Sequence, residues 1–146
     1  MRVKVYIEVT PGSRTKNLYN EKTFELEGVR EVREPYPYPY GFIIGTVTDD
    51  GEAVDAYIIT DAALEPGAPV ECEPVGMLEM MEGDEVDHKV LCALPGEDVE
   101  IGEDLRQVLR TFIIEVFKAY PKVKVEVGNI LPKQDALAHI HSAQEE

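Results

Sequence analysis

The sequence predicts a mainly β protein with α-helices, in which a small β barrel carries one or two helices near its C-terminal end. Two observations predict this class. Residues 42–94 contain several short segments rich in Ile, Val and Thr that are separated by Gly, Pro and Asp turns. From residue 105 the apolar period changes from two to about 3.6. At 146 residues the chain has the usual size of one domain, so we expect residues 1–146 to form a single domain.

The first half of the chain reads as strands and turns. Apolar Val3, Val5 and Ile7 alternate with polar neighbours, which predicts a strand that ends at the Pro11-Gly12 turn. The segment "KTFELEG", residues 22–28, predicts a second strand by the same alternation. The barrel strands follow between Phe42 and Leu94, cut by the turns "DDGE", "EPGAP" and "EGDE".

The last third predicts a helix, a strand and a second helix. Apolar residues in 105–116 recur at the spacing of one helix face, and Pro121 follows the end of that pattern. The segment "VKVEVGNI", residues 123–130, predicts the last strand. Pro132 is suited to the first turn of a helix, so a C-terminal helix is expected to begin there.

Composition excludes several kinds of protein. The formal net charge of -15 would repel a phosphate backbone and argues against nucleic-acid binding. No apolar run approaches the ~18 residues that span a bilayer, and the N-terminus lacks the pattern of a signal peptide, so we expect a cytoplasmic protein that does not bind membranes. Cys72 and Cys92 lack the spacing of a zinc or redox motif, and we expect buried free thiols.

An acidic turn, "DDGEAVD" at residues 49–55, lies between two strand-like segments. Asp50, Glu52 and Asp55 surround Gly51, and carboxylates that converge in a tight turn repel one another unless a cation balances them. Hard divalent ions such as Mg²⁺ prefer oxygen ligands of this kind. A solvated hairpin loop is the alternative, because Asp and Gly are ordinary turn residues. The strand-like flanks argue against an EF-hand.

A second acidic turn makes the metal interpretation stronger. Glu82, Asp84, Glu85 and Asp87 occur together in "MEGDEVDHK", and Lys89 follows closely. On its own this is another acidic hairpin. Two acidic turns beside apolar strands, however, would together line one mouth of a barrel.

The order of these segments resembles the soluble family I inorganic pyrophosphatases. That family carries an aromatic Y-P-x-N-Y-G segment before a D-G-D-P-x-D turn, then "PG", "PVG" and a D-x(4)-D-x-K turn. This chain has "YPYPYGFIIGTVTDDGEAVD", then "LEPGAPVECEPVG", then "EGDEVDHK", at matching spacings. Its "IEVTPGSRTK" is similar to the family's N-terminal segment. The resemblance covers about residues 3–130 and identifies a divergent member.

The resemblance implies an OB-fold-like five-stranded β barrel that hydrolyses pyrophosphate to two phosphates by metal-activated water. It implies Mg²⁺ as the cofactor, with Mn²⁺, Co²⁺ or Zn²⁺ as substitutes. Glu52 and Asp55 are the implied catalytic residues. The implied metal-binding residues are Asp50, Asp55, Asp87, Glu82 and Glu8. The implied phosphate-binding residues are Lys16, Arg30, Tyr40, Lys89 and Lys118.

The chemistry explains why such residues are needed together. Cations must neutralise pyrophosphate before water can approach phosphorus, and a metal also lowers the pKa of the attacking water. Several positions depart from the family pattern, and these departures leave the level of activity open. Leu18 stands where the family has a glutamate, Glu52 and Glu82 where it has aspartates, and Phe117 where it has a tyrosine. Gly28 stands where the family has a phosphate-binding arginine, which Arg30 would replace.

Two other functions remain open at this point. One is a module of the same fold that binds metal and phosphate or nucleotide without turnover. The other is a hydrolase of another small diphosphate or polyphosphate. The resemblance also implies a homo-oligomer, since bacterial members are usually hexamers, and the helix that carries Phe112 and Ile113 is the expected interface.

Overall fold

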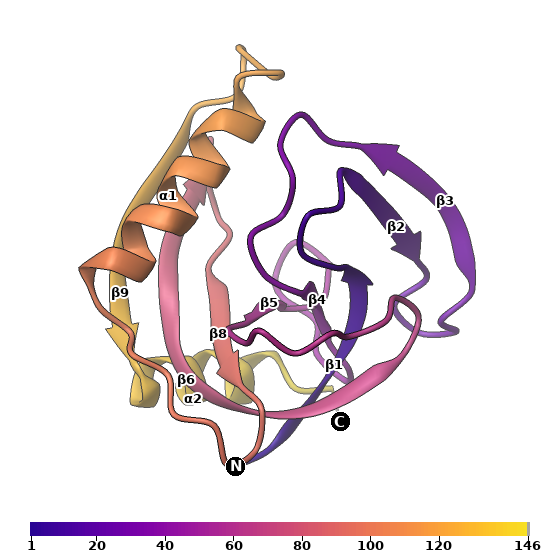
Figure 1. Ribbon diagram of the computed structural model, residues 1–146, viewed down its shortest axis with the longest axis vertical. Helices are drawn as coiled ribbons and strands as arrows, with labels where there is room; N and C mark the ends of the chain where they lie inside the picture. The colour runs from indigo at the N-terminus through magenta and orange to yellow at the C-terminus, as the bar shows by residue number, and fades with distance from the viewer. Residues whose placement is uncertain (146) are drawn as a thin grey trace.

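A computed structural model describes residues 1–145 of the chain, drawn as a ribbon in Figure 1. The described part is mainly β with two helices. Its elements are β1 (Val3–Val9), β2 (Thr15–Tyr19), β3 (Leu26–Glu31), β4 (Tyr40–Ile43), β5 (Asp55–Ile58), β6 (Pro69–Glu82), β7 (Glu85–Val86), β8 (Lys89–Ala93), α1 (Glu103–Phe117), β9 (Val125–Pro132) and α2 (Lys133–Ala143).

The main sheet closes on itself as a ring of five strands in the order β1-β4-β5-β8-β6, because β6 also pairs with β1. The ring is antiparallel except for β5 and β8, which run parallel. The long strand β6 continues beyond the ring and pairs there with β7 and β9. Figure 1 shows this curved sheet with α1 on one side, and the predicted five-stranded barrel is confirmed.

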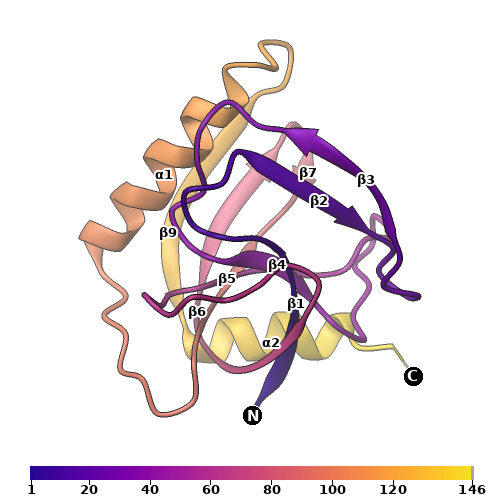
Figure 2. The ribbon, with the colours of Figure 1, turned by 45° about the vertical axis from the view of Figure 1, so that its right-hand side comes forward.

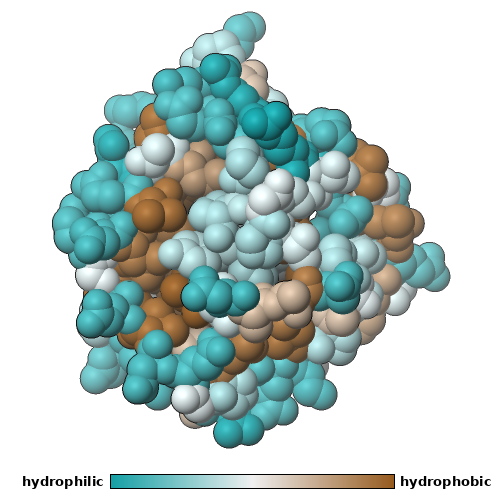
Figure 3. Space-filling view, viewed as in Figure 1, coloured by the Kyte–Doolittle hydropathy of each residue, from teal (hydrophilic) through white to brown (hydrophobic). Residues whose placement is uncertain are grey.

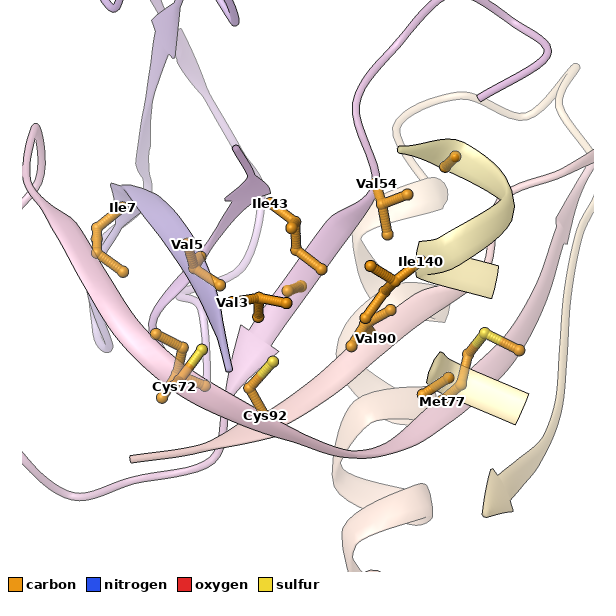
Figure 4. Packing of buried hydrophobic residues seen from close by; sticks show 14 residues of the cluster. Val3, Val5, Ile7, Ile43, Val54, Cys72, Met77, Val90, Cys92 and Ile140 are labelled. Carbon is orange, nitrogen blue, oxygen red and sulfur yellow. The ribbon is translucent and has the colours of Figure 1, made fainter. Parts of the chain in front are cut away.

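The barrel is filled by small and β-branched side chains that alternate along its strands. Val5, Ile7 and Ile58 are fully buried, and Ile140 and Ala143 of α2 pack against the same cluster, so α2 closes one end of the barrel. Figure 4 shows this packing, with Ile140 of α2 beside Val90 and Val54. Cys72 and Cys92 are buried free thiols in the same core, as predicted.

Helix α1 confirms the 3.6-residue pattern and packs its apolar face on the outside of the sheet. Leu105, Leu109, Phe112 and Ile113 are buried there against the tyrosines of the strands. Phe112 and Ile113 are 9% and 3% exposed, so a subunit contact through α1 would use other residues of the helix. Val108 from the same pattern is 45% exposed and does not join the core.

The hairpin of β2 and β3 forms a separate two-stranded sheet, which Figure 2 shows in front of the barrel. Of the predicted strand over residues 22–28, only residues 26–28 belong to a strand, because residues 20–25 form the turn between β2 and β3. Asn20 Oδ1 accepts hydrogen bonds from the backbone N–H groups of Lys22 and Thr23, at 2.9 Å each. Phe24 adopts a left-handed φ of 64°. Local turn chemistry therefore outweighs the alternating pattern.

One glycine fixes the approach of two ring strands. A Cβ atom on Gly41 of β4 would lie 1.9 Å from the Tyr6 carbonyl oxygen of β1. Only glycine fits this crossing. Within residues 1–145, neither helix is long and apolar enough to cross a membrane.

Candidate active site

The site is built where the parallel strands β5 and β8 begin at the same edge of the sheet. Their register pairs Ala56 with Val90, so Asp55 and Lys89, one residue earlier, start the two strands side by side. Lys89 Nζ donates to Asp55 Oδ2 at 2.8 Å and to Asp87 Oδ2 at 3.1 Å. The topology thus joins the two acidic turns of the sequence at one ammonium group.

Lys89 is 6% exposed, so the site carries a buried positive charge. Burial by itself would lower the pKa of Lys89, but the charges of Asp55 and Asp87 raise it well above its usual value. Burial would also raise the pKa of Asp55, yet the charges and hydrogen bonds around it outweigh that effect and lower the pKa. Lys89 and Asp55 therefore form a charged pair at neutral pH.

A hollow of about 730 Å³ opens beside this cluster, between the β2–β3 hairpin and α1. One part of its wall is charged and the other part is apolar. The charged residues of the wall include Glu8, Lys16, Glu21, Lys22, Arg30, Glu52, Asp55, Glu82, Asp87 and Lys89. In the view of Figure 3, which faces the molecule as Figure 1 does, hydrophobic side chains gather along the α1 side and hydrophilic ones surround them.

The acidic turn at residues 49–55 faces a second hollow. Gly51 has a φ of +85°, which glycine adopts without strain, and it turns the chain sharply between Asp50 and Glu52. Asp50 Oδ1 accepts hydrogen bonds from the Glu52 backbone N–H at 2.9 Å and from the Thr48 hydroxyl. Asp50 is exposed, yet it lines this second hollow of about 360 Å³ together with Glu52, Asp55 and Asp87.

Glu52, Asp55 and Asp87 line both hollows and therefore separate them. The central aspartates Asp50, Asp55 and Asp87 of the two acidic turns all line the smaller one. That these aspartates share an ion stays a prediction.

Three glutamates near this point have carboxyl groups that are harder to ionise than usual. Burial raises the pKa of Glu8 to about 7, and the charge of Asp55 adds to the effect. Burial raises the pKa of Glu52 as well, with further contributions from the neighbouring aspartates. Burial and the adjacent Asp87 raise the pKa of Glu82. Negative charge is therefore in excess here, as expected of a site that receives cations.

Cationic and phenolic groups line the same hollow. Tyr40 is 4% exposed, and its hydroxyl accepts a hydrogen bond from Lys89 Nζ at 3.1 Å. Lys16 Nζ lies 5.2 Å from the centre of the Tyr40 ring, within the range of a cation–π contact. Arg30 pairs with Lys16 across the β2–β3 ladder, and both line the hollow.

Two of the phosphate-binding assignments can be compared with the lining of the hollows, and one of them differs. Gly28 is not among the residues that line the larger hollow, so Arg30 is the arginine that this hairpin presents there. Lys118 lines neither of these two hollows, and its Nζ contacts Glu115 Oε1 at 2.6 Å. The α1 residues that do line the larger hollow are apolar, among them Phe117.

The donor chemistry fits a hard divalent cation, because all the converging acidic groups are carboxylates. Within residues 1–145, no three Asp, Glu, His or Cys side chains are arranged to hold one ion as they stand. Asp55 and Asp87 are instead held by the ammonium of Lys89. Cation binding therefore involves a change in the directions of these side chains.

The sequence interpretation missed Glu21 and the structural role of His88. Glu21 lines the larger hollow, and its Oε1 accepts a hydrogen bond from the Ala53 N–H at 3.0 Å. Glu21 lies outside both acidic turns and matches no motif, although Asn20 before it was a turn signal. His88 is half-buried, and its Nδ1 accepts a hydrogen bond from the Met80 N–H at 3.1 Å, which fixes the segment that carries Asp87.

Comparison with known proteins agrees with this geometry. A family model described as inorganic pyrophosphatase matches residues 5–146. The chain is 34% identical over 150 aligned positions to an inorganic pyrophosphatase from Synechocystis, which covers 98% of this chain and 88% of that protein.

Solved structures show the same fold. The crystal structure of an inorganic phosphatase from Anaplasma phagocytophilum is similar with a TM-score of 0.87 and 28% identity, over 97% of this chain and 91% of that one. The crystal structure of an inorganic pyrophosphatase from Thermus thermophilus is similar with a TM-score of 0.83 and 27% identity. The match covers 97% of this chain and 88% of that one.

Proposed function

The chain belongs to the inorganic pyrophosphatase family, and from this premise we propose that it hydrolyses pyrophosphate to two phosphates in a reaction that requires divalent cations. We propose Mg²⁺ as the physiological cation. The observation that carries the proposal is the meeting of Asp55 and Asp87 at buried Lys89, beside a hollow lined with further carboxylates and cationic side chains.

Asp50, Asp55 and Asp87 are the residues that would hold the cations, with Glu82 and Glu8 beside them. Their oxygen-only donor set supports this assignment. When bound, such cations neutralise the phosphate oxygens and make the attacking water more acidic. Glu8 is the most buried of the five, so it acts from within the wall of the hollow.

Glu52 is assigned to accept the proton of the attacking water, together with Asp55. A carboxylate with a raised pKa is a stronger base, which suits Glu52 to this role. Lys16, Arg30 and Lys89 are assigned to the phosphates, whose charge they would offset, and Tyr40 orients Lys89. Lys118 joins them only if its pair with Glu115 opens.

Phosphate release from pyrophosphate, measured with and without Mg²⁺, tests the function directly. We expect release that depends on Mg²⁺ and a loss of about 100-fold or more in kcat for Asp87→Asn, as for removal of a directly engaged group. Asp84→Asn is the matched control, because Asp84 is exposed in the neighbouring turn and lines neither of the two hollows described. Absence of release with Mg²⁺, Mn²⁺ and Co²⁺ would instead favour a module that binds without turnover.

A specific observation favours a second substrate class, the organic diphosphates. The hollow of about 730 Å³ has the size of pockets that hold drug-sized ligands and exceeds the need of pyrophosphate alone. Val32, Phe117, Tyr120 and Val123 give it an apolar wall beside the charged one. A panel of pyrophosphate, nucleoside diphosphates and tripolyphosphate, compared by kcat/KM, distinguishes the two classes.

We further propose one pyrophosphatase-like domain, a homo-oligomer and a cytoplasmic location. The family match over residues 5–146 supports one domain. Leu26 and Val29, each 58% exposed on β3, support a contact between subunits through the hairpin. The two free buried thiols are typical of a reducing compartment. Sedimentation velocity of the full chain measures the oligomeric state.

A further inference from the structure

Glu21 is a carboxylate that the assignments above leave unused. It lies in the turn between β2 and β3, outside both acidic turns, and it is half-buried in the wall of the larger hollow. Leu18, from the same hairpin, lines that hollow too but carries no oxygen. Glu21 therefore brings negative charge to the hairpin side of the wall, where Leu18 offers none.

The side chain of Glu21 is held in place by the acidic turn itself. Its Oε1 accepts a hydrogen bond from the backbone N–H of Ala53, at 3.0 Å. Ala53 is buried and stands between Glu52 and Asp55. The contact joins positions 21 and 53, which are 32 residues apart, and so ties the hairpin to the turn that carries the catalytic carboxylates.

The surroundings of Glu21 show that it shares the excess of negative charge. Burial raises the pKa of Glu21, the Ala53 hydrogen bond opposes this, and the charges of Asp55 and Glu52 raise the pKa further. A carboxylate fixed near two others is unfavourable unless a cation offsets the repulsion. The hydrogen bonds among residues 1–145 engage Oε1 only, so Oε2 is available to such a cation.

We propose that Glu21 is part of the cation site: Oε1 anchors it to the acidic turn, and Oε2 contributes charge to a divalent cation held by the neighbouring aspartates. The inference rests on the proposed function only in requiring that cations bind here. It adds the β2–β3 turn to a site otherwise built from β1, from the strands β5 and β6, and from the two acidic turns.

Calorimetric titration of the full chain with Mg²⁺ alone, without substrate, tests the proposal. Glu21→Gln removes the charge but keeps an oxygen that accepts the Ala53 hydrogen bond. We expect its Kd for Mg²⁺ to rise about 10- to 100-fold, the usual cost of losing a group that supports a metal site. Glu25→Gln makes the same charge change at an exposed position of the same hairpin, outside the hollow, and should leave the Kd within about twofold.

An unchanged Kd in Glu21→Gln overturns the proposal, and so does an equal rise in Glu25→Gln, which would reflect net charge only. Thermal unfolding in EDTA checks that each variant is folded. Should Glu21→Gln fail to fold, Glu21→Asp and Glu21→Ala replace it. We expect the Kd for Mg²⁺ to rise less in Glu21→Asp, which keeps the charge, than in Glu21→Ala. An equal rise in the two variants would overturn the proposal. Because these readouts need no turnover, a parent protein that binds Mg²⁺ but releases no phosphate would refute the hydrolase function and not this inference.

Discussion

Glu8 provides the sharpest quantitative test of the electrostatics at the barrel mouth. It is 7% exposed in β1, and burial raises its pKa from an ordinary 4.5 to about 7. A carboxyl group whose pKa is raised on folding stabilises the folded protein below its unfolded pKa, and that stability is lost as pH rises through the folded pKa. At about 1.4 kcal/mol for each pH unit, ionisation of Glu8 costs roughly 3 kcal/mol between pH 4.5 and pH 7.

Replacement Glu8→Gln removes this cost. We compare the free energy of unfolding of the variant with that of the parent. From pH 4.5 to pH 8 this difference should shift by about 3 kcal/mol in favour of the variant. The measurement is urea unfolding across this pH range in EDTA, so that no cation contributes. Glu25→Gln, at an exposed position, is the control. A difference between variant and parent that stays constant across the range would refute the reasoning.

Two further predictions concern the centre of the site and the closure of the ring. Asp55→Asn should abolish metal-dependent phosphate release. In urea unfolding without metal it should lower stability by about 1–3 kcal/mol, because Lys89 loses one charged hydrogen bond and keeps Asp87 as its charged partner. Retention of full rate and stability would contradict both assignments. Gly41→Ala should lower the melting temperature through a loss of about 3 kcal/mol or more, because its Cβ would meet the Tyr6 carbonyl oxygen, and an unchanged melting temperature would contradict the close crossing of β1 and β4.

The fold was largely predictable because its periodic signals are strong. Alternation in β1 and the 3.6-residue spacing in α1 both reflect which side of the element is buried. The hairpin was not, because residues 22–28 alternate in the same way although only Phe24 among them packs on a core cluster. There the side-chain hydrogen bonds of Asn20 decided the backbone.

The candidate site was predictable in its carboxylates and less so in its geometry. Spacing alone indicated that the acidic turns would meet, but the parallel pairing of β5 and β8, which places Lys89 between Asp55 and Asp87, is a property of topology. The structure ties Asp55 to the buried charge of Lys89, so Asp55 also contributes to stability, which the motif does not indicate. The side-chain direction of Lys118 depends on its neighbour Glu115 and could not be read from the motif.

The ammonium of Lys89 also bears on how the protein survives when divalent ions are scarce. Small metalloproteins whose ligands repel one another often unfold when the ion is removed. Here a covalently attached counter-ion remains with Asp55 and Asp87, so we expect the chain to stay folded without free metal. If Mg²⁺ is the cation, as proposed, its removal would stop turnover reversibly, and the folded chain would still resist proteolysis.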